Sequence, residues 1–170
     1  ALSRLNVTGT EKKTKLEILL VAGKADPHKY CYYSGLKVEY DPDKGLLKKI
    51  KKIEIINSDE NAKNVDFSKK NKSLYSVTAD SYMLEFIGII KKMSFGLINV
   101  IPKDSAGNRV TDMQTAVIDM DENKAGVQEG KEWLALMEYL GSMKDTDGSG
   151  IPDIDKKYSV PVQTFFAVKK

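Results

Sequence analysis

The residues best suited to chemistry lie in one short stretch, KDTDGSGIPDIDKKY, at positions 144–158. Read as an EF-type calcium loop, this stretch carries oxygen-bearing side chains at the ligand positions of the loop's first three-quarters. These side chains are Asp145, Asp147, Ser149 and Asp153. Calcium is a hard cation that prefers carboxylate, hydroxyl and carbonyl oxygens. The pattern therefore predicts that these four residues form a weak calcium site.

The same stretch also fits a solvated turn that binds no ion. An EF-type loop ends on a bidentate Glu, and this chain has Lys156 at that position. The change removes two ligand oxygens, although Asp155 could swing in as a substitute. Gly and Asp are common in turns for conformational reasons alone. Both interpretations stay open, and any affinity is expected to be no better than about 10⁻⁴–10⁻³ M.

Composition limits the other chemistry that the chain can carry. It has one histidine, His28, and one cysteine, Cys31. A di-metal hydrolase centre needs several His and Asp ligands, and a disulfide or a cysteine-based zinc site needs more than one cysteine. We therefore expect no catalytic residue here and no phosphate-ester hydrolysis by this chain alone, and we interpret His28 as a surface loop residue.

Charge and hydropathy limit the kinds of partner that the chain can bind. The chain has 27 Lys and Arg residues against 24 Asp and Glu residues, and only two of the basic residues are arginine. This near balance argues against a nucleic-acid face, since bidentate phosphate recognition depends on arginine. The apolar runs fall short of the ~20 residues that span a bilayer, so we expect no transmembrane segment. We expect no signal peptide at the start of this sequence. A mature secreted domain would also lack one, so this expectation does not indicate where the protein is located.

Hydrophobic periodicity predicts an α+β fold in which a mixed β-sheet packs with helices, forming one domain over residues 1–170. The expected helices are 10–23, 80–93 and 128–143, the last with a clean amphipathic pattern. The expected strands are 2–8, a hairpin within 30–56, then 73–79, 95–104 and 158–168. Residues 57–72 are polar and predict a loop. Pro161 predicts that the last strand lies at a sheet edge.

Three motifs, in this order, resemble the C-terminal domain of the 5′-nucleotidases. LSRLNVTGTEKKTKLEILL resembles a strand that enters a helix through a Leu-Thr-Gly step, and YYSGLKVEYDPDKG resembles a Ser-Gly-Leu strand that ends in Tyr-Asp and a proline turn. KSLYSVTADSYM resembles a Tyr-x-Val-x-Thr strand that ends at an aromatic residue. The motifs cover roughly residues 2–90, and the helix at 129–141 and the final strand also fit the family's ending.

The resemblance implies a two-domain, metal-dependent phosphoric-ester hydrolase that is periplasmic, extracellular or at the cell surface. In that family an N-terminal metallophosphoesterase domain holds two divalent metals, such as zinc or manganese, and the C-terminal domain supplies the nucleoside pocket. The resemblance covers only the second part. We therefore expect a fragment whose first strand, with the family's Asn-Gly-Gly-x-Arg and Pro-Phe-Gly segments, would precede Ala1.

The resemblance also implies the substrate-binding residues. Tyr82 matches a ring that stacks on the nucleobase, and Asp80 and Phe86 lie beside it in the sequence. The family's Gly-Gly-Asp-Gly segment corresponds to LEFIGII at 84–90, which offers apolar bulk instead of an accessible backbone. Two alternatives follow: Tyr82 could pack on the core instead, and the chain could be a non-catalytic binding or structural module that kept the fold and lost the nucleotide pocket.

Overall fold

The computed structural model describes residues 1–26, 28, 31–57, 61–82 and 100–168 of the chain. Within them lie two sheets. Strands β1 (Leu2–Thr8) and β5 (Leu74–Asp80) form an antiparallel pair. The other sheet has the order β4-β3-β2-β6, from Ala62–Asn64, Ile50–Ile56, Leu36–Tyr40 and Phe165–Ala167. Because β6 runs parallel to β2 and the other pairs are antiparallel, the sheet is mixed and the predicted α+β class is confirmed.

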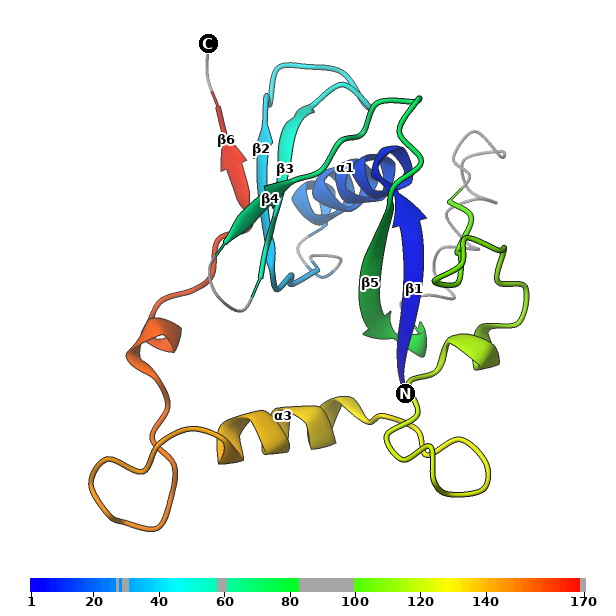
Figure 1. Cartoon of the computed structure of the whole chain (residues 1–170). Helices are drawn as coiled ribbons and strands as arrows, with labels where there is room; N and C mark the ends of the chain where they lie inside the picture. The colour runs from blue at the N-terminus through cyan, green and yellow to red at the C-terminus, as the bar shows by residue number, and fades with distance from the viewer. Residues whose placement is uncertain (27, 29–30, 58–60, 83–99, 169–170) are drawn as a thin grey trace.

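Helix α1 (Gly9–Ala25) follows β1 directly and contacts both sheets (Figure 1). Its start is fixed by a capping box, in which Thr8 Oγ1 accepts the backbone N–H of Glu11 at 3.3 Å and Glu11 accepts the backbone N–H of Thr8 at 2.8 Å. The prediction that this helix ends at Gly23 is wrong, because Gly23 is buried within α1. The helix stops only before Asp26, because the following Pro27 disfavours helical backbone there.

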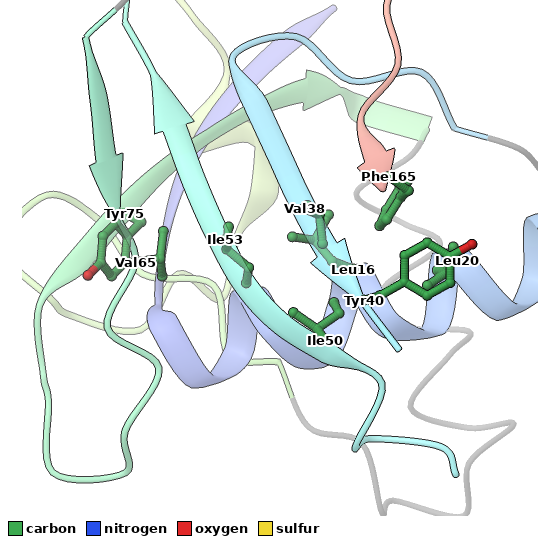
Figure 2. Close-up of a cluster of buried hydrophobic side chains, with 9 residues drawn as sticks. All are labelled: Leu16, Leu20, Val38, Tyr40, Ile50, Ile53, Val65, Tyr75 and Phe165. Atoms are coloured by element: carbon green, nitrogen blue, oxygen red, sulfur yellow. The ribbon is translucent and has the colours of Figure 1, made fainter. Parts of the chain in front are cut away.

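The main core lies between α1 and the β2–β3 hairpin (Figure 2). Val38 and Ile53 have no exposed surface, and they face each other across the hairpin in register. The cluster consists of Leu16, Leu20, Val38, Tyr40, Ile50, Ile53, Val65, Tyr75 and Phe165. It joins residues from α1 and from both sheets, which explains why the hairpin and the helix predicted from separate local patterns pack as one unit.

The structure corrects several predicted boundaries. The hairpin strands are shorter than the predicted 30–56 span, and the polar segment 57–72 contains the short strand β4. Residues 100–104 form no strand: Lys103 makes only isolated bridges, one to Asn6 and one to Arg109. The last strand begins after Pro161 and is confirmed at a sheet edge, but spans only Phe165–Ala167. Most of the predicted helix 80–93 lies outside the described residues.

Helix α3 (Glu132–Gly141) forms where the sequence predicts an amphipathic helix, but its apolar face is not packed. The helix lies away from both sheets and has no buried residue (Figure 1). Trp133 is 61% exposed and Met137 is 62% exposed. Among the described helices, none has the length and apolar character to cross a membrane. The single-domain prediction for 1–170 stays a prediction.

Candidate functional site

The C-terminal end of β5 and the N-terminal end of β1 lie side by side. The antiparallel register pairs Leu2 with Asp80, and the backbone N–H of Ser81 donates to the carbonyl of Ala1 at 2.9 Å. The Ser81 hydroxyl lies 3.0 Å from the same carbonyl. The other edge of β1 is also held, because the N–H of Leu2 donates to the carbonyl of Gly130 at 2.7 Å. The backbone that carries Tyr82 is therefore anchored to the start of β1.

Tyr82 follows this anchored step and presents its ring to solvent. It is 74% exposed, so the alternative in which Tyr82 packs on the core is wrong. Asp80 closes β5 two residues earlier and is partly buried. The register thus brings Asp80 and Tyr82 to one end of the two-stranded sheet. Phe86 and the segment 84–90 lie outside the described residues, so the third predicted substrate contact and the replaced glycine segment stay predictions.

The acidic loop brings three of its predicted ligands together. Oxygens of Asp145, Asp147 and Asp153 lie within 4.8 Å of one another. Each carboxylate accepts backbone N–H groups of the loop: Asp145 Oδ1 accepts from Gly148 and its Oδ2 from Gly150, both at 2.8 Å. These bonds shape the turn by themselves.

Hydrogen bonds within the loop favour the charged form of two carboxylates, Asp147 and Asp153. A hydrogen bond from the Thr146 hydroxyl, then one from its backbone N–H, lowers the pKa of Asp153. Bonds from Ser149 lower the pKa of Asp147 in the same way. Asp155 accepts the backbone N–H of Lys157 at 2.9 Å and caps the next turn, so it does not fill the place of the missing Glu. The three carboxylates suit a cation, but the loop lacks the bidentate ligand of a tight calcium site.

Several residues of the three sequence motifs have a structural role that is visible here. A Cβ at Gly9 would lie 2.1 Å from the Asp66 carbonyl oxygen, which explains the glycine after Thr8. Glu17 is fully buried and its Oε1 accepts the backbone N–H of Lys49 at 2.6 Å. Gly35 has a positive φ of 68°, and its carbonyl accepts the backbone N–H of Ile56, the last residue of β3, at 3.0 Å. These motif positions shape the scaffold.

The sequence did not indicate a cavity in which two lysines of α1 take part. Lys12 and Lys15 both line it, and Lys12 is buried with 7% exposure. The sequence contains one indication that Lys12 is buried. Lys12 precedes the core residue Leu16 by four positions and so lies on the same helix face. Both lysines belong to a run of charged residues, and such runs usually form a solvated face, so the sequence favoured an exposed position for them.

Comparison with known proteins gives one family. The family model described as the 5′-nucleotidase, C-terminal domain, matches residues 1–89. This range contains the whole β1–β5 pair, α1 and the β2–β3 hairpin, together with Asp80 and Tyr82. No curated protein and no solved structure matches the chain.

Proposed function

Because the chain belongs to the family of 5′-nucleotidase C-terminal domains, we propose that it is the substrate-recognition domain of a metal-dependent nucleotide phosphohydrolase. The observation that supports this most directly is the β1–β5 register, which anchors the backbone that leads to the exposed Tyr82 at the end of the sheet. An exposed aromatic ring on a fixed backbone is suited to stack on a nucleobase, which contributes about 1–3 kcal/mol per base.

In this proposal, phosphate-ester hydrolysis takes place in another domain. The chain has one histidine, and among the described residues the acidic loop is the only cluster of metal-ligating side chains. We propose that an N-terminal metallophosphoesterase domain supplies two divalent metals, zinc or manganese, that activate the nucleophile and stabilise charge on the phosphoryl group. This chain would bind and orient the nucleoside, with Tyr82 on the base and Asp80 beside it. Such a protein would work in the periplasm or outside the cell.

A non-catalytic module is the second candidate. The segment 84–90, LEFIGII, favours it because branched apolar side chains stand where the family resemblance implies a glycine-rich, nucleoside-lining segment. A module of this kind would keep the scaffold contacts of Gly9 and Glu17 and would bind no nucleotide.

The deciding experiment is an assay of the full-length protein with manganese or zinc and a panel of nucleotides. Tyr82→Ala should raise KM about tenfold or more with a smaller change in kcat, because a stacking face is lost. Tyr82→Phe should retain the wild-type KM, since the ring stays. Tyr158→Ala is a matched control, because Tyr158 is also exposed and lies in the C-terminal segment. An unchanged KM in a folded Tyr82→Ala protein would contradict the stacking role of Tyr82, and absence of turnover in the wild type would favour the second candidate.

A further inference from the structure

A cavity of about 400 Å³ lies between α1, the loop before β2 and the middle of the β1–β5 sheet. Its volume is within the range of about 300–1,000 Å³ that is typical of ligand pockets. The aliphatic residues of its lining are Val7, Leu16, Leu19, Leu36, Ile55, Ile56 and Val77. Neither Asp80 nor Tyr82 contributes to the lining, so this cavity is separate from the proposed nucleoside site.

Lys12 is the unusual residue of this cavity. Only 7% of the residue is exposed, and no hydrogen bond or ion pair to its ammonium group is found among the described residues. A buried charge without an acceptor is costly, so a buried lysine is normally paired. Two other lysines that contact α1 are paired with carboxylates: Lys13 Nζ lies 3.4 Å from Glu17 Oε2, and Lys103 Nζ lies 2.7 Å from Glu11 Oε2. Among the described residues, Lys12 therefore lacks the partner that comparable lysines have.

The charge of the lining indicates the partner. Lys15 is the other charged residue among the described lining, and no carboxylate lines the cavity there. Ser76 and Thr78 of β5 add hydroxyl groups that can donate hydrogen bonds. Two ammonium groups and several hydroxyl-bearing residues in a mostly apolar cavity form an environment for an anionic head on an apolar body.

We propose that this cavity binds a small organic carboxylate, with its apolar body against the leucine and isoleucine side chains and its carboxylate paired with Lys12 and Lys15. A carboxylate fits better than a phosphate. Phosphate sites commonly use arginine or free N–H groups at a helix N-terminus. The lining contains no arginine, and the N-terminus of α1 is already capped by Thr8 and Glu11.

Protonation adds a second signature of the site. Burial, and to a smaller extent the charge of Lys15, lowers the pKa of Lys12 to about 8. Burial also lowers the pKa of Lys15, against an opposing effect of Cys31. The other titratable residues that line the cavity are Tyr32 and Tyr33. A bound carboxylate favours charged Lys12, so binding should take up protons near pH 8 and weaken as the pH rises above that value.

The test is calorimetric titration of the full-length protein with sodium octanoate, with sodium phosphate as the second probe. We expect octanoate to bind with a Kd below 1 mM near pH 7 and phosphate not to bind at this site, in line with a cavity that is mostly apolar. Lys12→Met should weaken octanoate binding at least tenfold, and Lys15→Met should weaken it less. Lys48→Met removes the same charge from an exposed turn and should leave binding unchanged.

A folding readout accompanies the titration. Lys12→Met removes a charge that is largely shielded from water and has no partner among the described residues, so the ligand-free variant should melt no lower than the wild type. At the same octanoate concentration, the rise in Tm should be smaller in Lys12→Met than in the wild type. Tyr82→Ala should leave octanoate binding intact, which separates this site from the proposed nucleoside site. Absence of octanoate binding, equal binding by Lys12→Met, or binding of phosphate in place of octanoate would each overturn the proposal.

Discussion

Replacing Gly9 by Ala tests the physical basis of the strand-to-helix step. A Cβ at this position would lie 2.1 Å from the carbonyl oxygen and 2.9 Å from the carbonyl carbon of Asp66. The oxygen would have to retreat by about 0.9 Å, from 2.1 Å to 3.0 Å, to reach even the shortest separation that real Cβ atoms show. The clash is with backbone, so no change of side-chain rotamer can relieve it.

The segment that would have to move is held on both sides. The Thr10 hydroxyl donates to the Phe67 carbonyl at 3.1 Å, and the backbone N–H of Asp66 donates to the Tyr75 hydroxyl at 3.1 Å. Overpacking costs about 1–3 kcal/mol, and each lost hydrogen bond adds about 1 kcal/mol. The better helix propensity of Ala returns at most about 1 kcal/mol. We therefore expect Gly9→Ala to lower the free energy of unfolding by about 2–3 kcal/mol.

Urea unfolding followed by far-UV circular dichroism measures this difference, and hydrogen exchange of the α1 amides shows whether the helix itself is loosened. Gly45→Ala is the matched control, because a Cβ at Gly45 meets nothing within 4 Å. That variant should stay within about 0.5 kcal/mol of the wild type. A Gly9→Ala protein as stable as the wild type would refute the reasoning, since propensity would then outweigh the contact.

Three further predictions concern charge, metal and core. Burial raises the pKa of Glu11, but hydrogen bonds from Lys103 and others outweigh this and hold it below its ordinary value of 4.5. The pair therefore stabilises the fold above that pH, and its contribution is lost as the pH falls through the lowered pKa. Urea midpoints should show Lys103→Met less stable at pH 7 and closer to the wild type in acid. Calorimetric titration with calcium should show no binding tighter than about 10⁻⁴ M, since the loop lacks the bidentate Glu. Any weaker binding heat should vanish in the doubly substituted Asp145→Ala, Asp147→Ala protein, and micromolar binding would contradict the loop assignment. Ile53→Ala should cost about 2–5 kcal/mol in urea unfolding, because the side chain is fully buried. A cost below about 1 kcal/mol would contradict the core placement.

Local chemistry explains which parts of the fold could be predicted from the sequence. The capping box of Thr8 and the alternation of Val38 and Tyr40 are encoded within a few residues, and the structure confirms the helix start and the hairpin. Strand β4 was missed because its three exposed residues carry no apolar signal and pair only with the end of β3. Its pairing depends on tertiary context that the local pattern does not contain.

In the candidate site, too, locally encoded features could be predicted, whereas features that depend on tertiary contacts could not. Tyr82 could be identified because a motif marks it, but its position beside Ala1 depends on a register between strands far apart in the sequence. The place of Lys12 was missed because its neighbours in the sequence, Glu11 and Lys13, are charged, and only the packing of α1 against both sheets buries it. The apolar pattern of α3 correctly predicted a helix, but periodicity could not show that Trp133 would stay exposed.

Photolabelling of the full-length protein with an azido-adenine nucleotide tests the proposed function most directly. The proposed stacking on Tyr82 predicts that label appears in the tryptic peptide 73–91, which carries the end of β5, and that unlabelled nucleotide competes it away. Peptide 16–24 from α1 contributes Leu16 and Leu19 to the cavity that Lys12 and Lys15 line, and it should stay unlabelled. Competable label in the α1 peptide, with none in 73–91, would contradict the proposal that this end of the β1–β5 sheet recognises the nucleoside.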